Sequence, residues 1–217
     1  MSNTTEKNTT KTAAVQAGAQ AGAQTTGKAR YLTVIALMAA ISYILAFLEV
    51  PMPLAPSFAR MDASDVPALL TTFALGPVAG TVVELIKNVL QALSTSTGGI
   101  GELANFLMGA SLVFTAGLIY KQKKTRKMAV VSGVAGSVAM GIMAAIMNYF
   151  VLLPMYQIFM PIDQVIASFA EVIPFIHTKL DVVLYSALPG NILKGLIVSV
   201  ITMLVYKRVS PAMKGMR

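Results

Sequence analysis

The apolar stretch YLTVIALMAAISYILAFL, residues 31–48, decides the fold class, because it contains no charged residue. A helix needs about 20 mostly apolar residues to cross the hydrocarbon core of a bilayer, since each residue adds roughly 1.5 Å. Residues 31–48 are therefore predicted to form a transmembrane helix. The whole composition agrees, because 56% of the 217 residues are hydrophobic and only 12% are charged, against roughly 25% charged residues in a typical soluble domain.

Five further apolar stretches follow and are predicted to form helices over residues 66–75, 78–93, 103–120, 128–153 and 192–206. Asp65 followed by Pro67 is typical of a helix start, with a capping acid just before a first-turn proline. Residues 154–188 are too polar and too often interrupted by proline for a seventh span. A short amphipathic helix at the outer interface is predicted there, around residues 165–173. The fold class is therefore an all-α membrane protein with six transmembrane helices.

The basic residues predict how this bundle is oriented, because Lys and Arg concentrate in loops that stay in the cytoplasm. Four of them precede the first span, five lie in residues 121–127, and four follow the last span. The intervening loops contain only Arg60 and Lys179. An even number of spans puts the two termini on the same side of the membrane, and the charge distribution predicts that this side is the cytoplasm.

Three segments are expected along the chain. Residues 1–28 are rich in Thr, Ala, Gln and Gly and lack aromatic residues, which predicts a disordered cytoplasmic tail. Residues 29–210 form the predicted transmembrane domain. Residues 211–217 form a short cytoplasmic C-terminal tail.

Several functions are excluded or disfavoured by absences. The chain has no Cys and only one His, so thiol catalysis, disulfides and the usual zinc sites are not expected. It has no GxxxxGK[ST], HExxH or GxSxG motif. The net charge of +8 does not indicate nucleic-acid binding, because the basic residues cluster between apolar runs. No enzyme activity, metal site or cofactor is predicted.

Charged and amide side chains inside the predicted spans are candidates for function, because burying a polar group in hydrocarbon is costly. Glu84 and Lys87 are three residues apart and share one helix face. They form a structural ion pair, contribute to substrate binding, or serve as the proton-coupled site of an autonomous secondary transporter. Asn191 and Lys194 have the same spacing. They either grip the carbonyl-rich edge of a planar heterocycle, or serve as a helix cap and an interfacial anchor in a subunit without a ligand.

Two weaker signals complete the candidates. Asn148 lies inside a predicted span, where it either contacts a ligand or joins two helices by a hydrogen bond. Ala36 and Ala40 are four residues apart, and such small faces allow close helix approach. They indicate either a docking face for a partner membrane protein or internal packing.

Four motifs in order resemble a known family. They are PMPLAP (51–56) with MDASDVPAL (61–69), LGPVAG (75–80) with VELIKN (83–88), TGG (97–99) with GELANF (101–106), and GNILKG (190–195). Together they resemble the riboflavin-specific substrate-binding component of energy-coupling factor (ECF) transporters, over residues 30–208.

The resemblance implies a six-helix subunit without enzymatic activity, which binds riboflavin outside the cell and releases it to the cytoplasm. It implies association with a transmembrane coupling protein and two ATPases, with docking through Ala36 and Ala40. The implied ligand contacts are Leu54, Asn105, Asn148, Asn191 and Lys194.

The chemistry of riboflavin fits such a site, because a flavin needs apolar walls and a few placed donors. Leu54, Phe58 and Tyr149 are candidate walls. Another vitamin or a flavin nucleotide stays an alternative, although a phosphate would require basic groups where the outer loops offer only Arg60 and Lys179.

Overall fold

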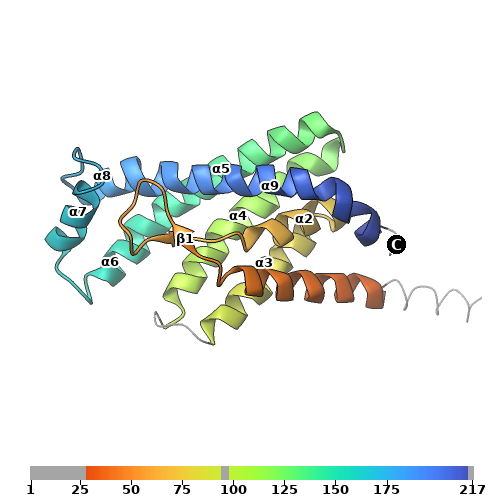
Figure 1. The fold of residues 1–217 in the computed structure, drawn as a ribbon, viewed down its shortest axis with the longest axis horizontal. Coiled ribbons are helices and arrows are strands. Elements are labelled where there is room, and N and C mark those ends of the chain that lie inside the picture. Colours follow the sequence, from red (N-terminus) through yellow and green to blue (C-terminus); the bar gives the residue numbers. More distant parts are fainter. Residues whose placement is uncertain (1–27, 94–97, 215–217) are drawn as a thin grey trace, which may run out of the picture.

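The chain forms a bundle of long helices, described here from a computed structural model of residues 28–93 and 98–214 (Figure 1). The elements after the N-terminal helix, Lys28–Leu45, are β1 (Val50–Pro51), β2 (Arg60–Met61), α2 (Asp65–Leu75), α3 (Pro77–Ala92), α4 (Ile100–Gln122), α5 (Arg126–Met147), η1 (Asn148–Leu152), α6 (Leu153–Tyr156), α7 (Ile162–Ala170), α8 (Lys179–Val182), η2 (Val183–Ala187) and α9 (Leu188–Lys214). The mostly helical prediction is confirmed. Residues 1–27 of the predicted N-terminal tail lie outside the described residues. Helix α9 continues to Lys214, four residues beyond the predicted end of the transmembrane domain at residue 210.

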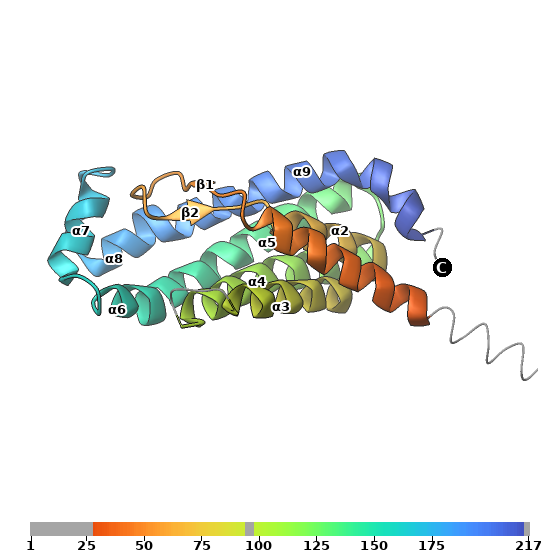
Figure 2. The same ribbon diagram turned by 60° about the horizontal axis from the view of Figure 1, so that its bottom comes forward.

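Four helical stretches are long and apolar enough to cross a membrane: Lys28–Leu45, Ile100–Gln122, Arg126–Tyr156 and Lys179–Val209. Helices α2 and α3 are shorter, with 11 and 16 residues. Helix α2 is buried along almost its whole length, and it packs against α3, α4 and α9. The start of the N-terminal helix and the end of α9 lie at the same end of the bundle (Figures 1 and 2).

Two helices continue through prolines that were predicted to break them. Pro154 lies in α6 directly after η1, and Pro189 lies in α9 directly after η2. Both preceding turns are π-helical, with hydrogen bonds from Leu153 N–H to the Asn148 carbonyl and from Leu188 N–H to the Val183 carbonyl. In a π-helical turn each N–H bonds to the carbonyl five residues earlier, one residue further back than in an α-helix. The carbonyl four residues before each proline therefore does not depend on the N–H donor that proline lacks. The last helical stretch therefore begins at Lys179 instead of Ile192.

A short antiparallel hairpin joins the N-terminal helix to α2. Val50 pairs with Met61 and Pro51 pairs with Arg60, and Met52 N–H donates to the Ala59 carbonyl. The loop inside it, residues 52–59, contains Leu54 in a left-handed conformation with φ 64°. These two-residue strands were not predicted, because proline-rich sequence offers no period-two pattern.

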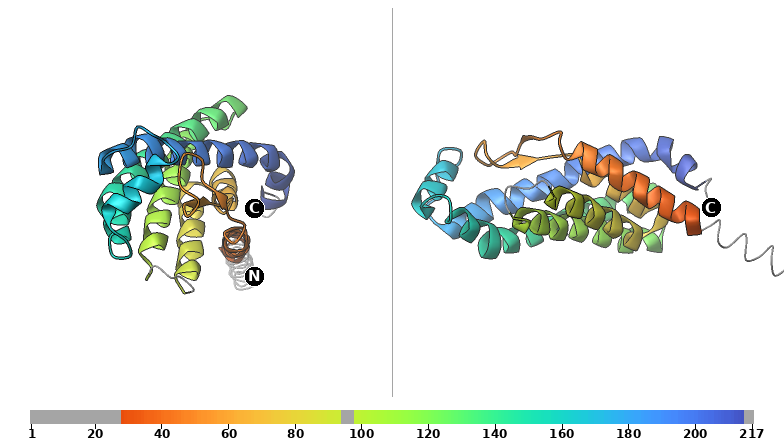
Figure 3. Two further views of the ribbon diagram at one scale, coloured as in Figure 1. Left: turned by 60° about the vertical axis from the view of Figure 1, so that its left-hand side comes forward. Right: turned by 90° about the horizontal axis from the view of Figure 1, so that it is seen from below.

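The core has two parts. The larger part lies among α2, α4, α5 and α9, where the buried side chains include Leu69, Phe73, Leu112, Met140 and Val198. The smaller part joins α6, α7, α8 and η2. The amphipathic helix predicted in this region is α7, which ends at Ala170 and buries Val165 and Phe169 against Leu153 and Val182. Figure 3 shows α7 and α8 at the end of the molecule away from the C-terminus.

Candidate functional site

A small cavity of about 170 Å³, here called the loop cavity, lies under the 52–59 loop. Helices α4 and α9 and the turns η1 and η2 form its walls, and α6 and α7 contribute one aromatic residue each. Its lining residues are Met52, Ala55, Phe58, Ala59, Arg60, Asn105, Met108, Asn148, Leu152, Tyr156, Phe169, Ser186, Ala187, Asn191 and Lys194. The site thus combines apolar and aromatic walls with three amides and two cations, Arg60 and Lys194.

Phe58 anchors the loop over the cavity. Its ring packs edge-on against Tyr156, with centroids 5.8 Å apart, and against Phe169, with centroids 6.0 Å apart. Both partners belong to the small core of α6–α8, which is why the hairpin loop and that part of the bundle form one aromatic cover. Edge-to-face aromatic pairs contribute about 0.5–1.5 kcal/mol each beyond the area they bury. These aromatic contacts add to the backbone hydrogen bonds of the hairpin in holding the cover in place.

The three amides reach the cavity from three different segments, α4, η1 and α9. Asn148 Nδ2 donates to the Ala144 carbonyl at 2.8 Å, and Asn191 Nδ2 donates to the Ala187 carbonyl at 2.8 Å. Each of these two amides therefore uses one of its N–H donors within its own helix. An amide has two N–H donors and a carbonyl acceptor, so both retain a donor and an acceptor for a ligand.

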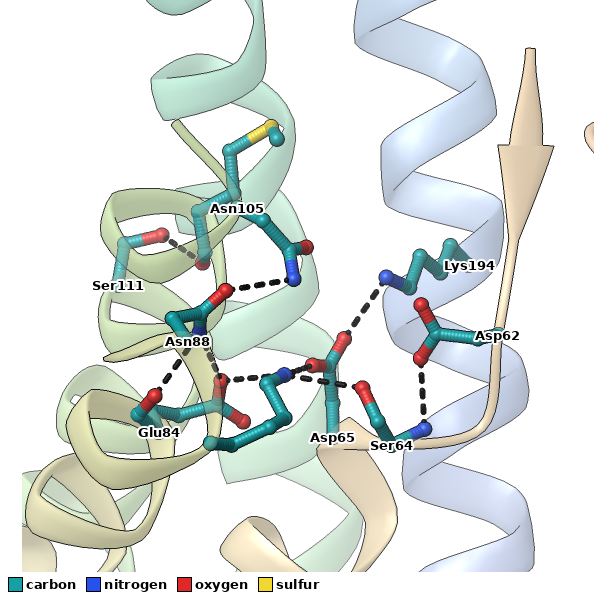
Figure 4. Close-up of polar contacts among 10 residues, drawn as sticks. Asp62, Ser64, Asp65, Glu84, Asn88, Asn105, Ser111 and Lys194 are labelled. Carbon is teal, nitrogen blue, oxygen red and sulfur yellow. Dashed lines mark hydrogen bonds and ion pairs between the residues drawn. The ribbon is translucent and has the colours of Figure 1, made fainter. Parts of the chain in front are cut away.

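Lys194 connects the cavity to a buried group of charges, here called the charged cluster and made of Asp65, Glu84, Lys87 and Lys194 (Figure 4). Lys194 Nζ lies 3.1 Å from Asp65 Oδ2, and Asp65 Oδ1 accepts a hydrogen bond from Lys87 Nζ at 2.7 Å. Lys87 Nζ also lies 2.7 Å from Glu84 Oε2 and donates to Ser64 Oγ at 2.9 Å. The side chains of Asp65, Glu84 and Lys87 are completely buried. Helices α2, α3 and α9 are therefore tied together by alternating charges.

Two asparagines extend this network to α4. Asn88 Nδ2 donates to the Glu84 carbonyl at 2.8 Å, and Asn105 Nδ2 donates to Asn88 Oδ1 at 3.0 Å (Figure 4). Gly109 of α4 makes the close approach possible, because a Cβ atom there would lie 2.6 Å from Glu84 Oε2. Among the described residues, Asn105 and Lys194 are the two that belong to this network and also line the loop cavity.

The sequence-predicted ligand residues are brought together in part. Phe58, Asn105, Asn148, Asn191 and Lys194 all line the loop cavity. Leu54 does not line it and is exposed at the tip of the loop, and Tyr149 is likewise exposed. Tyr149 follows Asn148 within η1 and does not line the cavity. At this point of the loop Ala55, the neighbour of Leu54, lines the cavity.

Glu84 and Lys87 form the ion pair that their spacing suggested, and neither lines the loop cavity. The contacts therefore favour the structural interpretation of this pair. Ala36 and Ala40 lie on the exposed face of the N-terminal helix, whereas Ala39 between them is buried. An exposed small-residue face is available to a partner, and internal packing does not account for it.

Sequence reasoning missed Asp65 as part of the site. It was predicted to cap α2, but Ser64 is the N-cap, and the Asp65 carboxylate faces the two lysines. A signal was present, because the predicted spans contain two lysines and only one acid. Two buried cations call for a second anion. Tyr156 was also missed as a wall, since residues after Pro154 were not expected to continue a helix. Phe169 was missed because its helix was predicted to lie at the outer interface and was not connected with the site.

Comparison with known proteins yields similarities over nearly the whole bundle. Residues 30–206 match the family model described as ECF transporter, substrate-specific component. The riboflavin transporter RibU of Staphylococcus aureus (strain TCH60) is 38% identical over 184 residues, covering 84% of this chain and 92% of that one. The riboflavin transporter FmnP of Bacillus subtilis (strain 168) is 31% identical over 193 residues, covering 88% and 97%. A solved structure of the S component of a bacterial ECF transporter has a TM-score of 0.67 at 36% identity, covering 86% of this chain and 99% of that one.

Proposed function

Because the chain belongs to the family of substrate-specific components of ECF transporters, we propose that it binds riboflavin in the loop cavity and delivers it across the bacterial cell membrane. The observation that carries this proposal is the meeting of three amides, two cations and an aromatic cover in a single cavity. The relatives RibU and FmnP are riboflavin transporters. This family is one of transport components, and catalysis is not part of the proposal.

The geometry suggests how the ligand lies. The isoalloxazine ring system of riboflavin is planar and apolar at its dimethylbenzene edge and carries carbonyls at its pyrimidine edge. Phe58, Tyr156 and Phe169 offer a surface for the apolar part. Asn191 and Lys194 are one turn apart on α9 and offer donors for the carbonyls. Such a division between apolar walls and few polar anchors is typical of small-molecule sites.

The loop must move to admit the ligand. Ligand cavities usually measure about 300–1,000 Å³, and the loop cavity measures about 170 Å³. The hairpin loop supplies the cover, and Pro51, Pro53 and Pro56 stiffen it so that it moves as a unit. The structure therefore supports a closed form whose cover lifts outward. Since the chain has no cysteine, the thiol of Ala55→Cys, which would line the cavity, can report this movement: bound riboflavin should slow its reaction with a water-soluble thiol reagent.

The bundle is proposed to span the membrane six times, with α2 and α3 as two short helices and both termini in the cytoplasm. The basic segment between α4 and α5 lies beside the last part of α9, so these basic regions share one end of the molecule. Export of a reporter fused after Lys214 would contradict this orientation.

The exposed face of Ala36 and Ala40 is proposed to dock a transmembrane coupling protein, which in turn binds two ATPases. Leu32, Leu37 and Ile44 extend the same helix surface as exposed apolar side chains. Replacing Ala36 and Ala40 by Leu should prevent co-purification with the coupling protein while riboflavin binding stays intact. Unchanged co-purification would move the docking face elsewhere.

The direct test of function is riboflavin binding by the purified protein. Bound flavin should lose fluorescence beside aromatic and amide side chains, and Asn191→Ala should weaken binding by about tenfold, the effect of one lost hydrogen bond to a ligand. Gln164→Ala is the matched control, because Gln164 is an exposed amide on α7 outside the cavity. Absence of binding, or equal affinities for the two variants, would reject the proposal.

A further inference from the structure

A second and larger cavity, here called the basic cavity, lies at the opposite end of the bundle and has a volume of about 720 Å³. The residues that line it come from the end of α2, the connection from α4 to α5 and the last turns of α9. Its lining residues are Phe73, Tyr120, Lys124, Thr125, Arg126, Ala129, Val130, Met203, Leu204, Tyr206 and Lys207. The loop cavity shares none of these residues, so the proposed riboflavin site leaves this cavity unexplained.

One side of the basic cavity is cationic. Lys124, Arg126 and Lys207 all line it, no acidic residue lines it, and none of the three forms an ion pair within residues 28–93 and 98–214. The backbone adds to this potential, because α5 begins at Arg126 and has no acidic residue in its first turn. The start of a helix carries a partial positive charge, and basic residues there leave it uncompensated. An anion would be stabilised at this position.

The other side of the basic cavity is apolar. Phe73, Tyr120 and Tyr206 form its floor, with neighbouring ring centroids 4.6–6.5 Å apart. Val130 and Leu204 line it as well, and they are 50% and 73% exposed on the outer helix surface. In a membrane-embedded bundle these exposed side chains face hydrocarbon. A ligand that filled both sides would need a charged group next to an apolar chain.

We propose that the basic cavity binds an anionic phospholipid. The phosphate lies among Lys124, Arg126, Lys207 and the start of α5, and an acyl chain runs along Val130 and Leu204. Basic pockets between transmembrane helices on the cytoplasmic side are suited to such headgroups. The charge complementarity selects an acidic lipid over a zwitterionic one, and the lateral apolar surface selects a lipid over a soluble anion. The lipid would hold α5 against α9 at the end opposite the substrate cavity.

The test compares two triple variants of the purified full chain that change the net charge equally. The first is Lys124→Gln, Arg126→Gln and Lys207→Gln, within the basic cavity. The matched control is Lys123→Gln, Lys127→Gln and Arg208→Gln, which are exposed residues of the same region outside its lining. Native mass spectrometry counts the phosphatidylglycerol and phosphatidylcholine that each protein retains, and the thermal unfolding midpoint without lipid checks folding.

The natural chain and the control triple should retain phosphatidylglycerol in preference to phosphatidylcholine, and the cavity triple should lose about tenfold or more of that retention. Glycerol 3-phosphate and inorganic phosphate should not displace the lipid. Equal loss in both triples would show diffuse surface attraction, and displacement by inorganic phosphate would show a soluble-anion site. Either result overturns the proposal, as does equal retention of the two lipids or binding of an acidic peptide in place of lipid.

Discussion

In the charged cluster each of Asp65, Glu84, Lys87 and Lys194 lies within 3.1 Å of an opposite charge. In the adjacent wall of the loop cavity, the amides of Asn148 and Asn191 bond only to carbonyls of their own helices. The two regions touch at Lys194 and Asn105. In the charged cluster every charge has an opposite charge beside it, whereas the amides of the cavity wall keep unused hydrogen-bond capacity.

This difference distinguishes the structural role of the charged cluster from the ligand-binding role proposed for the amides. A buried charge that loses its partner costs several kcal/mol, so the charged cluster must stay paired whether or not a ligand is present. A neutral amide costs less when part of its capacity faces a cavity, and its free donor and acceptor can then recognise a ligand. We therefore expect cluster substitutions to lower stability and amide substitutions to lower affinity.

The largest effect is expected from Asp65→Asn, which leaves Lys87 paired only with Glu84 and Lys194 with no anion. Removing one partner from a buried ion network costs about 3–5 kcal/mol, and the unfolding midpoint in detergent should fall accordingly. Glu49→Gln is the control, because Glu49 and Arg60 are half exposed and 3.8 Å apart, and such surface pairs contribute about 0–1 kcal/mol. Similar losses in the two variants would abolish the distinction between the regions.

Lys194→Met tests the residue that the two regions share. It removes one of the two cations beside Asp65, so stability should fall by about 2–3 kcal/mol, less than for Asp65→Asn, because Lys87 still compensates the acid. If Lys194 also contacts the ligand, riboflavin affinity should fall by about tenfold in the folded fraction, measured by fluorescence titration. A loss of stability with unchanged riboflavin affinity would assign Lys194 to a purely structural role in the charged cluster.

Gly109→Ala should cost about 1–3 kcal/mol of stability, because the new methyl group would lie 2.6 Å from Glu84 Oε2. A double-mutant cycle with Glu84→Ala isolates the steric effect, measured as the change in unfolding midpoint. The penalty of Gly109→Ala should largely disappear in the Glu84→Ala background. If the penalty persisted there, it would not come from contact between the new methyl group and the Glu84 side chain.

The smallest effect on folding is expected from Asn148→Ala, which removes one hydrogen bond to the Ala144 carbonyl and should change stability by about 0.5–1.5 kcal/mol. Riboflavin affinity should fall by about tenfold, because the free donor and acceptor are lost with the amide. Equilibrium titration beside thermal unfolding separates the two quantities. A variant that loses stability but binds normally would reassign Asn148 to helix packing.

Sequence patterns predicted the helices well because a long apolar run identifies a membrane helix without reference to its neighbours in the fold. The pair of Glu84 and Lys87 was also readable, since helical spacing alone brings them together. The partner of Lys194 was not, because Asp65 meets it only through the packing of α2 against α9. The helix boundaries near Pro154 and Pro189 were wrong, because the π-helical turns that accommodate these prolines leave no mark in hydropathy.

The ionic composition of the charged cluster bears on energetics across the membrane. Its two carboxylates and two ammonium groups sum to zero formal charge, although they lie deep in the bundle. One uncompensated charge that crossed the full field would exchange about 2.3 kcal/mol with every 100 mV of membrane potential. With all four groups ionised, this cluster itself carries no net charge through the field when the bundle rotates or tilts in the bilayer.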